Sequence, residues 1–422
     1  MSHYDIAVIG AGAAGLAAGL ALQKAGKNFI VLEARDRIGG RAFTDTSLGL
    51  PFDMGAHWLH SADVNPFVQI ADRLGLSYND QISFEGEHIV RFGKDGPLPA
   101  GVQAEIAQYI VKALEAFIAA GAAGRDVPFT DVFDPASRWY PLLHQLIGQI
   151  TSIDPEHCST LDASRYVYDG GDYPVMDGYG ALVARNAAGL PVTLATPVTR
   201  IDWSGRDVRL ETQRGTVTAS SVILAVPVNV LIADGIRFDP ALPPALVQAF
   251  RDCPMGVSEK LAILLDEPIQ GFGHVYGDVI FADPAKPPFN LHLNPFGRPL
   301  LVSHFGGSHG AELEELSDDE MMALAMEAMV EAFGANMKKR VVASLRTHWA
   351  SDPWTLGGYS HARPGKAASR LMFSEPVGDR IVLAGEHCSI PFFSTVHGAH
   401  LSGIAAADKA VRLIQRSARR PS

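Results

Sequence analysis

The chain has 422 residues, 47% of them hydrophobic, with 41 glycines and 27 prolines, which is typical of a globular enzyme. This length exceeds that of one ordinary hydrophobic core, so we expect two domains. The formal net charge of −11 disfavours nucleic acid and acidic membrane surfaces as partners. The negative charge either attracts a cationic ligand over long range or only keeps the protein soluble.

No segment is predicted to span a membrane. The most apolar helical stretch, residues 102–120, contains Glu105, Lys112 and Glu115, which predicts an amphipathic helix. A predicted strand begins almost at the N-terminus, so we expect no signal peptide. The three cysteines have wide, irregular spacing, which predicts neither disulfides nor a zinc site. We therefore expect a cytoplasmic protein with no metal site and no membrane partner.

The N-terminal residues predict a βαβ unit. An apolar run at residues 4–9 predicts a strand, small residues with leucines at 13–25 predict a helix, and residues 29–32 predict a second strand. The chain then reaches Glu33 directly after that strand.

A glycine motif, GAGAAG at residues 10–15, lies between the first strand and the helix and matches the GxGxxG pattern of dinucleotide-binding folds. Gly10 allows the tight turn, Gly12 lets the backbone approach a pyrophosphate, and Gly15 lets the helix pack close to the sheet. The helix N-terminus attracts the negative charge, and Glu33 is placed to accept hydrogen bonds from ribose hydroxyls. The motif predicts a dinucleotide site, without separating FAD from NAD.

The remaining elements alternate between helical and strand-rich segments. A helical region is predicted at 64–153, strands at 191–203, 208–212 and 222–226, and strands of another sheet at 260–265 and 300–304. Ser317 and Glu320 predict a capping box for a helix that ends before Gly334. A last strand at 380–383 precedes a final helix at 396–416.

Several motifs, taken in order, resemble those of a known family. The run EARDRIGGR at residues 33–41 is similar to the signature of the flavin-containing amine oxidases, which include monoamine oxidases, polyamine oxidases and the flavin histone-lysine demethylases. The resemblance continues through DMGAHWLH at 53–60, TPV at 196–198, SVILAVPV at 221–228, WASDPWTLGGYS at 349–360, GEH at 385–387 and TVHGA at 395–399. The motifs at 57–60 and 395–399 are closest to those of polyamine oxidases.

The resemblance implies FAD as the cofactor and an α/β fold. We expect a Rossmann-type FAD-binding domain from residues 1–78, 167–240 and 374–422. It is interwoven with an α+β substrate-binding domain from residues 79–166 and 241–373, in which helices flank a mixed sheet. The implied FAD contacts are Gly10, Gly12, Ala14, Gly15, Glu33, Arg35, Gly40, Arg41, Gly55, Ala56, His57, Trp58, Val198, Trp349, Glu386, Thr395 and Val396.

Two features of these motifs concern the flavin itself. Monoamine oxidases carry a cysteine, linked covalently to FAD, where this chain has Gly358. The resemblance therefore implies noncovalent FAD. The final helix begins near Gly398 and Ala399, and we expect its dipole and free N–H groups to stabilise negative charge on the reduced flavin.

The resemblance also implies four residues at the reacting site. Lys260 aligns with a lysine that holds a water near flavin N5; in the alternative, it points to solvent beside Glu259. Tyr359 falls on the aromatic position that flanks the amine, or it is a core tyrosine. Thr395 replaces the second tyrosine of monoamine oxidases. His60 either lines the amine channel or is a satisfied core residue.

The implied reaction oxidises the carbon–nitrogen bond of a primary or secondary, polyamine-like amine to an imine. Water hydrolyses the imine, and O2 is reduced to H2O2, so the expected partners are a small amine and O2. Two alternatives stay open, which are a related desaturase or protoporphyrinogen-oxidase-like flavoprotein and a catalytically silent FAD-binding protein. No segment indicates an oligomeric state.

Overall fold

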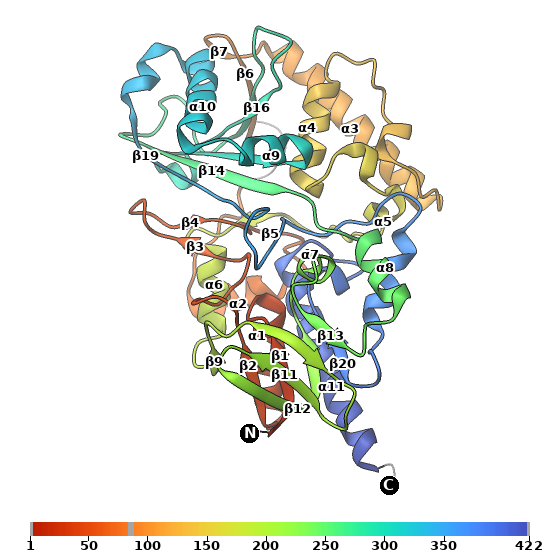
Figure 1. Ribbon diagram of the computed structural model, residues 1–422. Helices are drawn as coiled ribbons and strands as arrows, with labels where there is room; N and C mark the ends of the chain where they lie inside the picture. The colour runs from red at the N-terminus through yellow and green to blue at the C-terminus, as the bar shows by residue number, and fades with distance from the viewer. Residues whose placement is uncertain (1–2, 83–87, 420–422) are drawn as a thin grey trace.

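The computed structural model describes residues 3–82 and 88–419, which form two packed halves (Figure 1). The lower half in Figure 1 contains an eight-stranded sheet, and both ends of the described chain lie at its bottom. The upper half contains two four-stranded sheets with helices around them. Segments from the beginning, middle and end of the sequence meet in the lower half, as their red, yellow-green and blue colours show.

The eight-stranded sheet is built around a parallel core. Its order is β13 (Arg237–Asp239), β10 (Val198–Asp202), β11 (Val208–Thr212), β12 (Gly215–Leu224), β1 (His3–Ile9), β2 (Phe29–Leu32) and β9 (Val192–Thr193), with β20 (Ile381–Leu383) also paired to β12. Strand β1 runs parallel to both β12 and β2. Ile6, Ala7 and Val8 are fully buried because layers cover both faces of this central strand.

Helices cover the two faces of this sheet and complete two hydrophobic cores. On one face α1 (Ala13–Lys24) packs against α11 (Val396–Arg419), beside α2 (Pro66–Leu74) and α6 (Tyr179–Asn186). The other core includes α7 (Val228–Ile232) and α8 (Pro244–Asp252). The N-terminus of α1 is thereby fixed at the end of β1, where a dinucleotide phosphate binds in such folds.

The upper half has an antiparallel sheet with the order β17 (His292–Leu293), β18 (Leu300–Gly306), β14 (Ser258–Leu265) and β19 (Val341–Arg346). One face of β14 packs Leu261 and Ile263 into a core with α10 (Asp318–Phe333). Ala262 belongs to the opposite face and packs against Phe52. Because side chains alternate along a strand, Lys260 shares the face of Ala262, which is turned toward the lower half.

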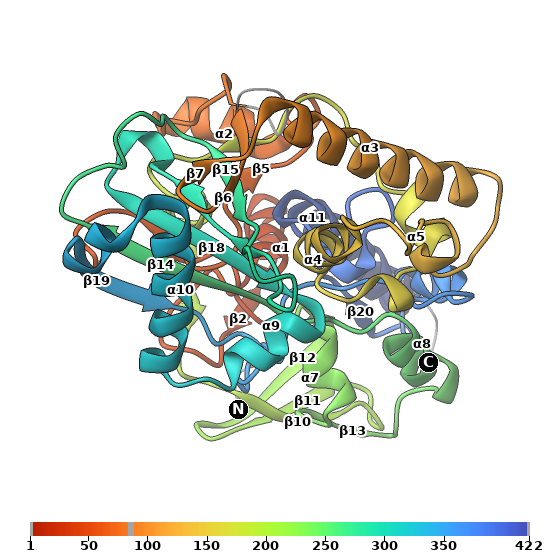
Figure 2. The same ribbon diagram turned by 90° about the horizontal axis from the view of Figure 1, so that it is seen from above.

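The remaining elements form a helical lobe and three small sheets. The lobe consists of α3 (Ala100–Ala122), α4 (Tyr140–Thr151) and α5 (Thr160–Ser164), seen together in Figure 2, while α9 (Gly307–Glu314) lies between α4 and β14. The small sheets join β16 (Phe289–Asn290), β15 (Tyr276–Val279), β6 (Ile89–Gly93) and β7 (Gly96–Pro97), then β3 (Thr44–Asp45) with β4 (Phe52–Asp53), and β5 (Trp58–Leu59) with β8 (Tyr173–Pro174). Within the described ranges, no helix has the length and apolarity needed to cross a bilayer.

Most predicted elements are present, with one clear error. Strands β2 and β11 have the predicted bounds, and Ser317 and Glu320 form both hydrogen bonds of the capping box that begins α10. The predicted helical region at 64–153 is helical only in part, because β6 and β7 form a hairpin inside it; its residues 83–87 lie outside the described residues. Strand β6 pairs with β15 far along the chain, a partner that local periodicity does not reveal. The division into two domains at the predicted boundaries stays a prediction.

Candidate active site

The turn after β1 requires glycine. Gly10 has φ +98°, and a Cβ on it would lie 2.5 Å from the carbonyl oxygen of Ala225. A Cβ on Gly15 would lie 1.8 Å from the carbonyl oxygen of Gly10, so only glycine lets α1 begin so close to the strand. Ala14, the other predicted contact in this turn, is buried in the same core.

The start of α1 forms an open backbone cradle. Gly12 is the N-cap of α1, and among the described residues no side chain hydrogen-bonds to the first-turn amides. The nearest atom to a Cβ on Gly12 would be the Cα of Gly40, 4.0 Å away, and Gly12 also bridges to Gly39. Uncapped amides between two glycine backbones fit a dinucleotide pyrophosphate.

Glu33 is fixed beside this cradle. Its side chain is buried, and its Oε2 accepts a hydrogen bond from the Ala11 amide at 2.6 Å while Oε1 accepts from the Arg35 amide at 2.9 Å. Each carboxylate oxygen retains a second lone pair for a ribose hydroxyl. The buried Val198, at the start of β10, is the predicted adenine contact.

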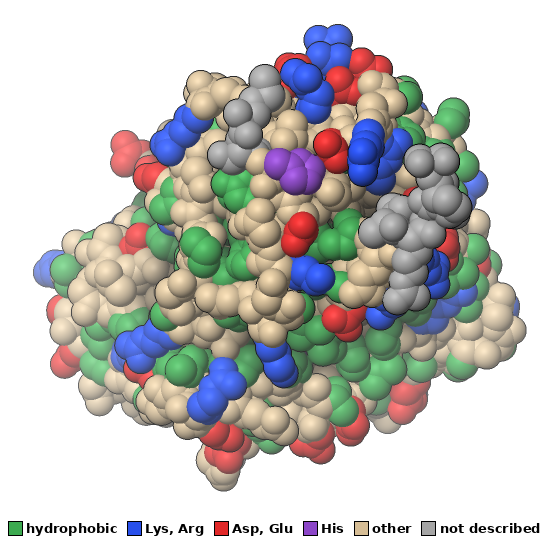
Figure 3. Space-filling view, turned by 90° about the horizontal axis from the view of Figure 1, so that it is seen from below, with side chains coloured by type: hydrophobic (Ala, Val, Ile, Leu, Met, Phe, Trp, Pro, Cys, Tyr) green, Lys and Arg blue, Asp and Glu red, His purple; other side chains and the backbone are tan. Residues whose placement is uncertain are grey.

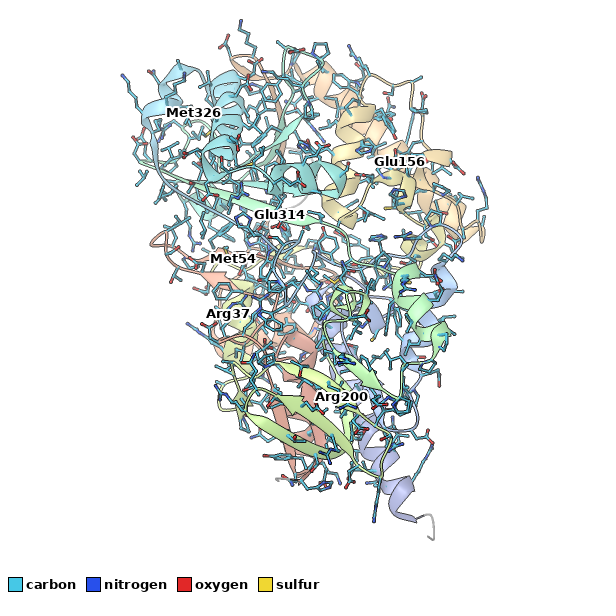
Figure 4. The ribbon with its side chains drawn as sticks, viewed as in Figure 1. Arg37, Met54, Glu156, Arg200, Glu314 and Met326 are labelled. Atoms are coloured by element: carbon cyan, nitrogen blue, oxygen red, sulfur yellow. The ribbon has the colours of Figure 1, made fainter. Side chains whose placement is uncertain are left out.

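Arg35 connects the two halves. Its guanidinium donates to the carboxylate of Asp352 at 2.7 Å and to the hydroxyl of Thr355 at 2.6 Å. Both partners belong to the 349–360 motif. Figure 4 labels Arg37 and Met54 near the junction of the halves, and the indole of Trp349 donates to the Met54 carbonyl at 3.0 Å. Arg35 and Trp349 therefore join the glycine-rich segment to the 349–360 motif.

A partly buried ion pair joins the second glycine turn to the C-terminal loop. Arg41 donates to the carbonyl of Gly358 and lies 3.1 Å from Oε1 of Glu386. The other oxygen of Glu386 accepts from the hydroxyl of Ser360 at 2.7 Å and from the Ser394 amide at 3.0 Å. Burial alone would raise the pKa of Glu386, but Arg41, His387, the Ser360 hydroxyl and Arg370 outweigh it and lower the pKa to about 2. Glu386 is thus a fixed negative charge.

Lys260 points into the junction between the two halves. Its Nζ donates to the carbonyl of Asp53 at 2.9 Å and to the carbonyl of Gly55, and its side chain is buried. The alternative that Lys260 points to solvent is wrong. Burial lowers its pKa to about 8, although the charge of Asp53 opposes the shift. Lys260 can therefore gain or lose a proton near neutral pH.

The 53–60 segment runs between Lys260 and the second glycine turn. The Ala56 amide donates to the Arg41 carbonyl at 3.2 Å, so the Gly55–Ala56 backbone lies against this turn. His57 lies 3.2 Å from Oδ2 of Asp53, and burial lowers its pKa. The indole of Trp58 donates to the hydroxyl of Tyr276 at 3.0 Å. The centroid of the Trp58 ring lies 5.8 Å from the Lys260 Nζ.

His60 lies at the far end of the same segment. Its Nδ1 is 3.0 Å from the carboxylate of Asp172, and its side chain is about one-third exposed. His60 is therefore a paired, partly accessible histidine.

Tyr359 and Thr395 have polar partners of their own. The hydroxyl of Tyr359 donates to the carbonyl of Gln149 in α4, and burial raises the pKa of this tyrosine to about 12. The hydroxyl of Thr395 accepts from the Gly398 amide at 3.0 Å and donates to the Phe392 carbonyl at 2.7 Å. Thr395 thereby caps α11 immediately before Val396.

This capping corrects one expectation. The amide of Gly398 is bonded to the Thr395 hydroxyl and the amide of Ala399 to the Thr395 carbonyl, so neither N–H group is free. Thr395 is a good N-cap residue, and it satisfies these amides in the absence of another acceptor. The expectation of free N–H groups is therefore wrong for Gly398 and Ala399, while the helix dipole can still stabilise nearby negative charge.

Three histidines beside Lys260 were not found from the sequence. His274, His292 and His304 line one pocket with Lys260 and with His57, which was a predicted FAD contact. The rings of His292 and His304 stack at 4.8 Å, and burial lowers the pKa of both far below 6.5, so both are neutral at pH 7. Strand alternation was the one signal in the sequence that could have placed His304 in this pocket. Alternate residues of a strand share a face, so His304 lies on the same face of β18 as the apolar Leu300 and Val302. Within the described ranges, no group of three or more His, Cys, Asp and Glu could hold a metal.

The chain matches a family model described as flavin containing amine oxidoreductase over residues 13–95 and 111–411. It is 31% identical to polyamine oxidase 4 of Oryza sativa subsp. japonica, over 97% of this chain and 88% of that protein. It is 27% identical to human lysine-specific histone demethylase 2, over 96% of this chain and 53% of that protein. Wild-type putrescine oxidase bound to putrescine has the same fold, with a TM-score of 0.76 at 23% identity and coverage of 97% of this chain and 99% of that one.

The residues present fit FAD. The amides at the start of α1, the buried Glu33 and the Arg41–Glu386 pair provide a phosphate cradle, a ribose acceptor and fixed charges. The family match and this arrangement agree with the predicted Rossmann-type α/β fold and with FAD as cofactor. The chain therefore belongs to the flavin-containing amine oxidoreductases and is an FAD-dependent amine oxidase.

Proposed function

We propose that this enzyme oxidises a carbon–nitrogen bond of a primary or secondary, polyamine-like amine and uses O2 as the electron acceptor. The amine loses two electrons and two protons to become an imine, and water converts the imine to an aldehyde and an amine or ammonia. O2 takes the two electrons and two protons and becomes H2O2. The similarity to polyamine oxidases and to putrescine oxidase supports this substrate class.

Buried Lys260 carries the proposal. Its Nζ donates to the carbonyls of Asp53 and Gly55, in the segment that lies along the flavin in this family. Its lowered pKa suits a group that holds a water and exchanges a proton. When bound, FAD supplies the acceptor for a two-electron oxidation. We propose that Lys260 holds the water beside it and that Tyr359 flanks the substrate amine.

The surroundings favour a neutral reacting amine. The pocket beside Lys260 is lined by Phe52, Phe296 and neutral histidines, and Lys260 itself is cationic below a pH of about 8. An ammonium that enters such a site loses hydration and meets a like charge, so its pKa falls. We propose that this environment selects the neutral amine, which has the free lone pair the oxidation needs.

We also propose that His60 lies on the amine's approach path, which its partial exposure and its pairing with Asp172 support. A cytoplasmic location is proposed as well. All three cysteines are free thiols, which supports a reducing compartment.

A panel of mono-, di- and polyamines tests the reaction and separates the alternatives. We expect anaerobic addition of a di- or polyamine to bleach the flavin absorbance, and admission of air to restore it with one H2O2 per turnover. Bleaching by a non-amine substrate alone would indicate the desaturase-type alternative. If no compound bleached the flavin, the catalytically silent alternative would hold.

Acid precipitation tests how FAD is held. Gly358 offers no thiol, and a Cβ at this position would lie 2.5 Å from the Cβ of Ser258, so a cysteine does not fit without movement. We expect trichloroacetic acid to release all of the yellow colour into the supernatant. Colour retained in the washed pellet would contradict noncovalent binding.

A further inference from the structure

A second hollow lies apart from the pocket at Lys260 and shares no lining residue with it. It has a volume of about 780 Å³ and is bordered by α7, by α8 and by the chain around Arg363. Helices α7 and α8 are neighbours at the right of the junction in Figure 1. A hollow of this size accommodates a small metabolite.

Three basic side chains belong to its lining. Arg251, Arg363 and Lys366 are exposed, and none of them forms an ion pair with any residue in the described part of the chain. The one acidic residue in the lining, Asp252, is buried and accepts hydrogen bonds from Gln248 at 2.9 Å and Ser369 at 2.7 Å. The lining therefore contains three cationic side chains and one carboxylate, and the hydrogen bonds to that carboxylate come from uncharged side chains.

Two of these cations also act on Asp252. Burial alone would raise the pKa of Asp252, but Ser369, Gln248, Lys366 and Arg363 together lower it, so both cations lie close enough to act on this carboxylate. The chain as a whole carries a net charge of −11. A concave basic surface on an acidic protein concentrates anions locally, while the rest of the surface repels them. Figure 3, which views the molecule from below, shows acidic and basic side chains interspersed on that face.

The floor of the hollow is tied to the reacting segment. The amide group of Asn229 donates to the carbonyl of Leu356 at 2.6 Å and to the carbonyl of Met255 at 3.0 Å. Asn229 and Leu356 both line the hollow, and Leu356 has φ +57°. Tyr359 follows three residues later, so an occupant would touch the segment that carries this tyrosine.

We propose that this hollow binds a small multivalent anion through its phosphate or carboxylate groups, at a site separate from the FAD and amine sites. Arg251, Arg363 and Lys366 supply the charge, and the Gln248 and Asn229 side chains border the ligand. The site is independent of the substrate proposed above, because neither Lys260 nor Tyr359 belongs to it.

Isothermal titration of the FAD-loaded enzyme with inorganic pyrophosphate, and separately with citrate, tests the site at constant ionic strength. We expect one of the two anions to bind with a dissociation constant below about 1 mM, and the double variant Arg363→Glu with Lys366→Glu to weaken binding at least about 10-fold. The control variant Arg209→Glu with Arg214→Glu makes the same change in net charge on the hairpin of β11 and β12, and it should bind like the wild type.

The two probes separate phosphate from carboxylate recognition, and either result supports the proposal. Absence of binding by both anions would overturn it. Equal weakening in the two double variants would also overturn it, because the effect would then follow net charge and not this hollow. Flavin absorbance recorded for each variant confirms that the cofactor is still bound.

Discussion

Replacement of Lys260 by methionine is expected to lower the rate of amine oxidation by roughly 100-fold or more while FAD stays bound. Methionine has a similar length but cannot hold a water or donate to the Asp53 and Gly55 carbonyls. Stopped-flow measurement of flavin reduction, and of reoxidation by O2, identifies which half-reaction slows. Lys112→Met, on the exposed face of α3, is the matched control and should leave both rates unchanged.

The same variant tests the pH dependence. Lys260 has a folded pKa of about 8, below its ordinary value of 10.5. Between these values the unfolded chain binds more protons than the folded chain, so the contribution of Lys260 to the free energy of unfolding rises as pH increases from 8 to 10.5. We expect the rate of the slowed half-reaction to titrate near pH 8 in the wild type and to lose this step in Lys260→Met. Unchanged rates and an unchanged pH profile would remove Lys260 from the proposed chemistry.

The glycine turn and the position of Glu33 were the most predictable part of the candidate site, because their signals are local. Gly10, Gly15 and Glu33 follow from strand, turn and helix chemistry within one short stretch, and the structure places them in one cradle. The pairing of β6 with β15 depends on a partner distant in sequence, and the stacking of His292 on His304 depends on the pairing of β17 with β18. The local hydrophobic periodicity of a sequence does not reveal which strands pair, so the histidine-lined pocket was found only from the structure.

Gly398 shows a different reason for a missed detail. The sequence placed a helix N-terminus correctly at residue 396, but the direction of the Thr395 hydroxyl decides whether the first amides are free. This choice of rotamer depends on Phe392, whose carbonyl accepts from the same hydroxyl. Helix starts are therefore readable from sequence, while the state of individual amides depends on the surrounding loop.

Replacement of Arg370 by methionine is expected to lower the free energy of unfolding by about 3–5 kcal/mol. Arg370 is almost fully buried, and its guanidinium donates to both carboxylate oxygens of Asp162, at 2.9 and 2.6 Å. Methionine would leave the buried Asp162 charge without its partner. Chemical denaturation of the FAD-loaded protein, at fixed cofactor concentration and followed by tryptophan fluorescence, measures the loss.

The double variant Asp162→Asn with Arg370→Met separates the pair from its surroundings. Because it removes the uncompensated charge, we expect it to be more stable than Arg370→Met alone. Arg370 also donates to the hydroxyl of Ser360 at 3.0 Å, and Ser360 donates to Glu386, so both variants should bind FAD more weakly than the wild type. If the two variants were equally stable, the cost would come from lost packing and not from the charge of Asp162. If FAD affinity were unchanged, the path from Arg370 through Ser360 to Glu386 would have no part in holding the cofactor.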